Sequence, residues 1–171
     1  MKIKLKKINN NARLPEKGKP GDLGYDVWAV SEEEIFPNVW MYRLGFKYEI
    51  DRETFKDRYL EGISDTPSRI PFTRNFWDMF DISIDVRPRS SISSTGMMLA
   101  NSPGTLDEFF RGEPRAVFYH VYPDMPRYRV GDKIAQIKVG IAPKNVQFEW
   151  AEEINENTER GEGGFGSTGK Q

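Results

Sequence analysis

Short stretches in which apolar and polar residues alternate are spread along the chain. Residues 2–8 alternate charged and apolar positions with a period of two, which is typical of a half-buried β-strand. Similar β-like runs occur at residues 39–50, 81–86, 116–122 and 133–141. Clusters of Gly, Pro, Asn and Asp lie between these runs and indicate turns. Many short strands with regular turns predict an all-β domain, a sandwich or a barrel.

One segment departs from this pattern. Residues 51–62, DRETFKDRYLEG, begin with Asp, carry acids near the front, and place Phe55, Tyr59 and Leu60 at helical spacing. Residues 64–77 contain prolines and aromatics without a clear period. We therefore predict one short amphipathic helix in an insertion of about residues 51–75. No linker divides the chain, so residues 1–159 are expected to form one domain around this insertion.

The last residues, 160–171, are dominated by glycine. Taken alone, such a terminus is typical of a disordered tail. Gly164, Gly169 and Lys170 have the spacing of a phosphate-binding P-loop, but Gln171 stands where Ser or Thr is required, so that class is rejected. Closely spaced glycines still expose backbone N–H groups that suit phosphate oxygens.

Composition narrows the class of protein. A chain of 171 residues is large enough to bury one core, and 25 basic against 26 acidic residues argue against a nucleic-acid-binding protein. There is no cysteine and a single histidine, His120, so any metal is expected to be a hard cation held by oxygens. No apolar run approaches the roughly 20 residues of a membrane span, and we expect a cytoplasmic protein without a membrane partner.

Two polar segments stand out between the predicted strands. Residues 87–96, RPRSSISSTG, combine guanidinium and hydroxyl groups beside a turn. Residues 101–107, NSPGTLD, form a hairpin candidate that ends on an acid. On composition alone the first is as well explained by a polar loop, and the acid of the second by a solvated cap.

Taken together, five ordered segments resemble the motifs of the trimeric dUTPase family. They are GDLGYDVWA at 21–29, PRSS at 88–91, NSPGTLDEFFRG at 101–112, GDKIAQ at 131–136, and the tail from 160 to 169. The tail is the most specific of the five, while the first and fourth are weak alone. The resemblance covers nearly the whole chain except the insertion.

The resemblance implies a fold, an activity and an assembly. The expected fold is a distorted jelly-roll barrel with a flexible Gly-rich C-terminal arm. The expected enzyme hydrolyses dUTP to dUMP and pyrophosphate with Mg²⁺, which limits uracil in DNA and supplies dUMP for dTMP synthesis. The family is a homotrimer whose active sites are shared between subunits, so residues 160–171 are expected to close as a lid over a neighbouring subunit's site.

The resemblance also implies roles for individual residues. Asp107 corresponds to the base that activates the water attacking the α-phosphorus, and Asp26 to the acid that contacts Mg²⁺ through water. The remaining matched positions bind substrate: Arg89, Ser90, Ser91 and Gln136 at the phosphates; Asn101, Gly104, Thr105 and Leu106 at uracil; Phe110 under the deoxyribose; and Arg160, Phe165, Gly166, Ser167 and Thr168 in the tail, with Phe165 covering uracil.

The sequence departs from the family motifs at two positions, and two other functions remain as alternatives. Phe110 stands where the family usually has Tyr, and Leu23 replaces a small residue of the first motif. One alternative is a dCTP deaminase or bifunctional relative, against which the Phe-containing tail and the 101–107 hairpin argue. The other is a regulatory protein whose aromatic insertion binds a partner, with catalysis secondary.

Overall fold

The computed structural model describes residues 2–52, 79–155 and 157–158. Within these ranges the chain forms short strands and one 3-10 helix, separated by turns. In order they are β1 (Lys2–Lys7), β2 (Tyr25–Trp28), β3 (Ser31–Phe36), β4 (Val39–Arg43), β5 (Phe46–Asp51), β6 (Phe80–Pro88), η2 (Ser90–Ser94), β7 (Met97–Leu99), β8 (Gly104–Leu106), β9 (Arg115–His120) and β10 (Lys133–Pro143).

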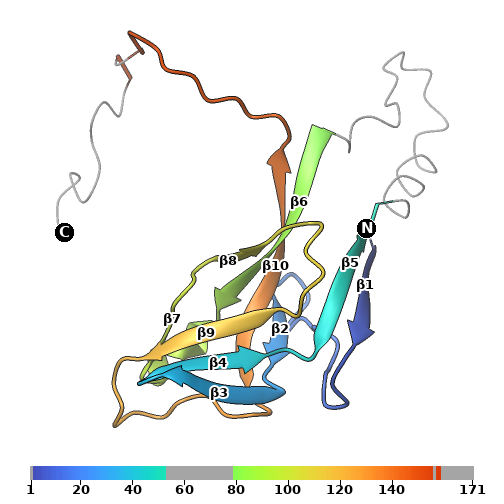
Figure 1. Ribbon diagram of the computed structural model, residues 1–171, viewed down its shortest axis with the longest axis vertical. Coiled ribbons are helices and arrows are strands. Elements are labelled where there is room, and N and C mark those ends of the chain that lie inside the picture. Colours follow the sequence, from blue (N-terminus) through green and yellow to red (C-terminus); the bar gives the residue numbers. More distant parts are fainter. Residues whose placement is uncertain (1, 53–78, 156, 159–171) are drawn as a thin grey trace.

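These strands pair into three antiparallel sheets (Figure 1). One has the strand order β2-β10-β6-β8, a second has the order β3-β4-β9-β7, and β1 pairs with β5 alone. Neighbouring strands are often distant in sequence, as where β10 joins β2 and β6. The sheet β2-β10-β6-β8 therefore combines strands from the N-terminal, central and C-terminal thirds of the chain.

The alternation of side chains explains why the sheets close on one core. In β6 every second residue is buried, with Ile82, Ile84 and Val86 facing inward and their neighbours more exposed. Phe118 of β9 is fully buried, and its ring packs edge-on against Tyr42 of β4, with centroids 5.7 Å apart. The hydrophobic surfaces of the sheets therefore meet in a single cluster.

All five β-like runs predicted from the sequence contain strands. The run at 39–50 proves to be two strands, β4 and β5, because Gly45 breaks it with a positive φ of 77°. A Cβ on Gly45 would lie 2.9 Å from side-chain carbons of both Ala12 and Val30, so glycine is required there. The short strands β2, β7 and β8 and the Glu-rich β3 were not predicted, because they are brief or highly charged.

The predicted helix falls largely outside the described residues. Asp51, expected to begin it, is instead the last residue of β5, paired with Lys2 of β1. The rest of the 51–75 insertion and the tail from 160 onward lie outside the described ranges, so their structure and any partner of the insertion stay predictions. Across the described part of the chain, no helix has the length and apolar character needed to cross a membrane.

An ion network fixes the loop before β10 to the edge strand β3. Arg127 donates to the Glu32 carboxylate at 3.1 Å and lies over the Trp40 ring at 3.4 Å. Arg129 contacts the same carboxylate at 3.4 Å. Burial raises the pKa of Glu32, but the bonds and charges of the two arginines outweigh it and hold that pKa below its ordinary value.

This network predicts a pH-dependent contribution to stability. A carboxyl whose pKa is lowered by folding stabilises the protein above its unfolded pKa, here 4.5, and this contribution is lost as the pH falls through the folded value. We expect Glu32→Gln to lower the free energy of unfolding at pH 7 by about 1–3 kcal/mol. Urea titrations from pH 7 downward should show this difference shrinking below pH 4.5, whereas Glu33→Gln, an exposed neighbour, should change little. A difference independent of pH would contradict the assignment.

Candidate active site

The sheet β2-β10-β6-β8 carries the predicted acidic residues at its two opposite edges. Asp26 belongs to the edge strand β2, and Asp107 directly follows the other edge strand, β8. Strands β10 and β6 lie between them. Gln136 of β10 and Arg89, which follows β6, contact Asp26, and Asp85 of β6 contacts the hairpin before Asp107.

Asp26 is the centre of a polar cluster. Its side chain is almost fully buried, with 3% of the residue exposed. Arg89 donates from Nε to Oδ1 at 3.0 Å, and Lys133 Nζ lies 3.1 Å from Oδ2. Gln136, directly opposite Asp26 in the β10–β2 register, donates from Nε2 to Oδ1 at 3.1 Å. The structure thus brings together residues of the first, second and fourth predicted motifs.

The surroundings of Asp26 favour its charged form. Burial raises the pKa of Asp26, but the hydrogen bonds of Gln136 and Lys133, with the charge and hydrogen bond of Arg89, hold it below its ordinary value. Gly24 makes room for this arrangement, because a Cβ there would come within 2.7 Å of Gln136 Oε1. The carboxylate is therefore a fixed anion that orients two cations and an amide.

The Arg89 guanidinium makes several hydrogen bonds within its own chain. Beyond Asp26, its Nη1 donates to Ser91 Oγ at 3.3 Å and to the Lys133 carbonyl at 3.2 Å. Ser90 and Ser91 open the 3-10 helix η2, which Arg89 immediately precedes. The guanidinium thus aligns the serine turn with Asp26, and its predicted phosphate contact stays a prediction.

The Asp107 backbone is held while its carboxylate is left open. Its carbonyl accepts hydrogen bonds from the Tyr48 hydroxyl at 2.6 Å and from the Phe110 N–H at 3.0 Å. Burial, and then the charge of Asp107, raise the pKa of Tyr48 to about 12, so the phenol remains a donor. Among the described residues, the Asp107 carboxylate has no hydrogen-bond or ion-pair partner, and it lines a cavity of about 390 Å³ beside Ser83 and Thr105.

The hairpin before Asp107 is tightly closed. A Cβ on Gly104 would lie 3.3 Å from the Asn101 carbonyl oxygen and 3.4 Å from its amide nitrogen. Thr105 donates from Oγ1 to Asp85 at 3.1 Å, and Leu106 packs against the core. The Phe110 ring lies 6.3 Å from that of Tyr48 and remains partly exposed. The predicted uracil and deoxyribose residues therefore lie in the hairpin and turn on either side of Asp107.

The two groups are not joined within one chain. No hydrogen bond or ion pair connects Asp107 to the Asp26 cluster in the described ranges 2–52, 79–155 and 157–158. Asp26 and Asp107 belong to strands three spacings apart in the sheet, which corresponds to at least about 14 Å. Within one copy of the described chain, the Asp26 cluster and Asp107 are therefore separate groups at opposite edges of the sheet.

The described residues offer few ligands for a metal. Within the described part of the chain, no group of three or more His, Cys, Asp or Glu side chains could hold a metal ion. Both Asp26 oxygens already contact Arg89, Lys133 or Gln136. This donor set fits a Mg²⁺ ion that keeps its water and contacts Asp26 through it, rather than one bound by several carboxylates.

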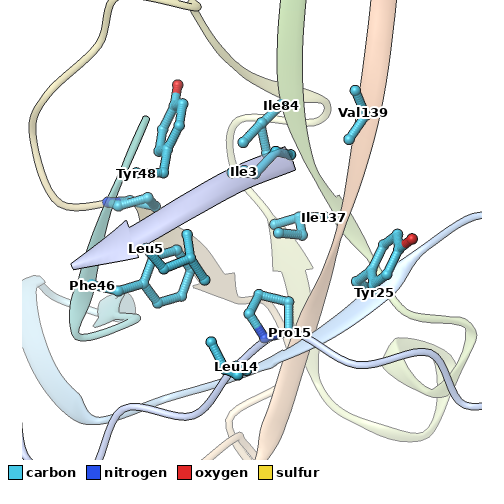
Figure 2. A pocket seen from close by; sticks show the side chains of 11 residues that line it. Ile3, Leu5, Leu14, Pro15, Tyr25, Phe46, Tyr48, Ile84, Ile137 and Val139 are labelled. Carbon is cyan, nitrogen blue, oxygen red and sulfur yellow. The ribbon is translucent and has the colours of Figure 1, made fainter. Parts of the chain in front are cut away.

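A larger cavity elsewhere is apolar (Figure 2). It has a volume of about 430 Å³ and lies between the β1–β5 pair and strands β6 and β10, where Leu5, Phe46 and Ile137 face it. The described residues of its lining include no carboxylate, histidine or lysine. It therefore lacks the groups for phosphate chemistry and is distinct from the candidate active site.

Some contributors were not predicted from the sequence. Lys133 belongs to the 131–136 segment but had no assigned role, and Tyr48 alternates along β5 like any core residue. Only the register of β10 against β2, and the position of β5 beside the hairpin, reveal what they contact. The tail residues Arg160, Phe165, Gly166, Ser167 and Thr168 lie outside the described ranges.

The comparisons with known proteins identify the family. The model of the dUTPase family matches residues 70–169, more than half of the chain. The deoxyuridine 5'-triphosphate nucleotidohydrolase of Helicobacter pylori strain J99 is 32% identical over 172 residues, covering 99% of this chain and 97% of that protein. The chain belongs to the dUTPase family. A relative with the same description from Clostridium kluyveri is 33% identical and covers 99% of each chain.

Solved structures of dUTPases share the fold. The dUTPase of Staphylococcus bacteriophage 80alpha with dUpNHpp matches with a TM-score of 0.66 and 18% identity, covering 99% of each chain. A mutant dUTPase from phage phi11 of S. aureus, described as showing the coordination of a structural Mg(II) ion, matches with a TM-score of 0.58 and 15% identity, covering 91% of this chain and 99% of that one. The predicted all-β, dUTPase-like jelly-roll fold is confirmed.

The contact between Gly24 and Gln136 makes a testable prediction. We expect Gly24→Ala to displace the Gln136 side chain from Asp26 and to lower kcat/KM for dUTP at least about tenfold, the loss of roughly 1.4 kcal/mol. Because both changes act through one contact, adding Gly24→Ala to Gln136→Ala should cause little further loss. Steady-state kinetics of the two single variants and the double variant measure this, and fully additive effects would contradict it.

Proposed function

We propose that this protein hydrolyses dUTP to dUMP and pyrophosphate, with Asp107 as the general base. Membership of the dUTPase family supports the substrate and the reaction. Such an activity, which we expect in the cytoplasm, limits uracil in DNA and supplies dUMP for dTMP synthesis. The local environment of Asp107 supports the role of that residue.

The observation that carries the proposal is a carboxylate that no described residue pairs with, on a backbone held by hydrogen bonds. Tyr48 and the Phe110 N–H fix the Asp107 carbonyl, and Asp107 lines a cavity of about 390 Å³. Such a group can accept a proton from water as the water oxygen bonds to the α-phosphorus. The bond from that phosphorus to the bridging oxygen then breaks, and pyrophosphate leaves. A positioned general base contributes about 10²–10⁴-fold.

The closed hairpin supports recognition of uracil. Asn101 lies over Gly104, so backbone groups of residues 101–106 and the Asn101 amide can pair with the base in a narrow space. The same closeness leaves no room for the methyl group of thymine, and cytosine would place a donor against a donor, at about 1–3 kcal/mol per unmatched group. The partly exposed Phe110 ring offers a face for the deoxyribose.

The Asp26 cluster supports binding of the triphosphate. Ser90 and Ser91 supply hydroxyls, and Arg89 and Lys133 supply positive charge beside them. A Mg²⁺ ion bound with the substrate would neutralise charge on the triphosphate, and Asp26 would hold it through water. We further propose that the tail closes over this site as a lid, with Arg160, Ser167 and Thr168 at the γ-phosphate and Phe165 and Gly166 at the nucleoside.

We also propose that the active enzyme is a homotrimer in which the Asp26 cluster of one copy faces Asp107 of another. Two features support association. Asp26 and Asp107 lie at opposite edges of one sheet. In addition, the segment after β10 leads away from the body of the molecule (Figure 1), and its Phe148 and Trp150 side chains are almost entirely exposed.

The exposed segment and the apolar cavity are complementary in chemistry. Val146, Phe148 and Trp150 alternate along residues 144–155 without contacting the core of their own chain. Large exposed aromatic groups of this kind mark interaction surfaces. Seating this segment on the apolar cavity of a neighbouring copy would bury both surfaces and link the subunits.

Turnover of different nucleotides tests the proposed substrate. We expect pyrophosphate release from dUTP with Mg²⁺, and at least about tenfold lower kcat/KM for dCTP, dTTP and UTP. dCTP leaves a buried polar group unmatched, the methyl group of dTTP clashes in the hairpin, and the 2'-hydroxyl of UTP meets the Phe110 ring. Removing Mg²⁺ with a chelator should lower the rate. Pyrophosphate release and ammonia release are followed together, and ammonia from dCTP would favour the deaminase alternative.

The role of Asp107 is tested by Asp107→Asn. The amide keeps the shape of the side chain but cannot take the proton, so we expect kcat to fall about 10²–10⁴-fold while affinity for a non-hydrolysable dUTP analogue changes little. Calorimetric titration and single-turnover kinetics measure the two quantities. Asp124→Asn, on an exposed loop, serves as the control. An Asp107→Asn enzyme with the wild-type kcat would remove Asp107 from the mechanism.

A further inference from the structure

The residue next to the proposed base has an unusual environment for an acid. Glu108 directly follows Asp107 and is only 7% exposed. Its carboxylate meets Arg52 in a two-pronged pair, Nε to Oε1 and Nη2 to Oε2. The hydrogen bond of Arg52 lowers the pKa of Glu108 despite its burial. A buried carboxylate without such a partner would be strongly unfavourable, so the pair determines where this side chain can lie.

Arg52 is itself anchored in the fold. It directly follows β5, and its Nη2 also donates to the carbonyl of Phe80, the first residue of β6, at 2.9 Å. The Arg52 guanidinium therefore joins the end of β5, the start of β6 and the turn after β8. Arg52 itself lies within residues 51–75, the range predicted for the insertion.

The same turn receives further donors at its backbone. Arg111 donates from Nη1 to the carbonyls of Glu108 at 2.9 Å and Phe110 at 3.1 Å. Tyr48 donates to the carbonyl of Asp107. The Glu108 carboxylate also receives a backbone hydrogen bond from Ile82 of β6. Its side chain therefore links the turn beside the base both to β6 and, through Arg52, to the end of β5.

We propose that Arg52 and Glu108 are positioning residues that hold Asp107 in its catalytic orientation. The inference rests on the proposed role of Asp107 as the base. If the pair is broken, Glu108 can turn toward water, and the turn that carries Asp107 loses its side-chain link to β5. A displacement of about 1 Å at a reacting group can cost on the order of 10²-fold in rate. Because neither Arg52 nor Glu108 is among the residues proposed to contact uracil or phosphate, the loss should appear mainly in kcat and not in KM.

Conservative variants separate this role from a purely structural one. Glu108→Gln keeps the shape but loses the charge, and Arg52→Lys keeps the charge but loses the two-pronged geometry. The matched controls are Glu32→Gln and Arg127→Lys, which weaken another partly buried Arg–Glu pair far from Asp107 in the fold. Thermal unfolding and sedimentation of every variant show whether it is folded and associated as the wild type is.

We expect Glu108→Gln and Arg52→Lys each to lower kcat about 10–10²-fold, with KM for dUTP within about threefold of wild type. The double variant should be little worse than either single variant, because both act through one contact. The controls should lower thermal stability and leave kcat unchanged.

Three outcomes would overturn the inference: a folded Glu108→Gln enzyme with wild-type kcat, a rise in KM at unchanged kcat, or an equal loss of kcat in the controls. Asp107→Asn measured in parallel separates this inference from the proposed function. If Asp107→Asn is inactive but Glu108→Gln is not impaired, only the positioning role fails. If Asp107→Asn is fully active, the proposed base itself fails.

Discussion

The separation of Asp26 and Asp107 across one sheet is the constraint on which the account depends. The order β2-β10-β6-β8 places the two acids on opposite edge strands, at least about 14 Å apart. Hydrogen bonding between the intervening strands fixes this distance, so no side-chain rotation can bring the two groups together in one chain. Under the proposed function, an active site that uses both acids would combine edges from different copies. The exposed segment after β10 and the apolar cavity are the surfaces proposed to link those copies.

Contacts within the described chain already organise both proposed halves of the site. Around Asp26, a buried carboxylate aligns Arg89, Lys133 and Gln136, so the cations and the amide need not be ordered during binding. At the other edge, hydrogen bonds fix the backbone of Asp107 while leaving its carboxylate open. Fixed dipoles and charges of this kind lower the reorganisation that a reaction requires. The strands supply these fixed groups at both edges of the sheet. The proposed chemistry therefore lies at strand ends and adjoining turns.

Much of this was accessible from the sequence, and the remainder has identifiable physical reasons. Period-two alternation identified the longer strands. Strands β7 and β8 have only three residues each, which is too short for an alternating pattern to be recognised. Asp26, Arg89 and Gln136 could be selected by motif, yet their mutual contact depends on the β10–β2 register, which local sequence does not encode. Tyr48, Arg52 and Glu108 carried no signal because their roles arise from long-range packing between β5 and the turn after β8.

The most direct test of the account is subunit complementation. Asp26→Asn and Asp107→Asn are prepared separately, mixed in denaturant and refolded together in equal amounts. If the Asp26 cluster of one copy serves Asp107 of another, random mixing leaves about one site in four with both acids intact, so about a quarter of wild-type dUTP hydrolysis should return. If both acids act within the same chain, no mixed assembly can contain an intact site. Mixtures no more active than either variant alone would then contradict the shared site.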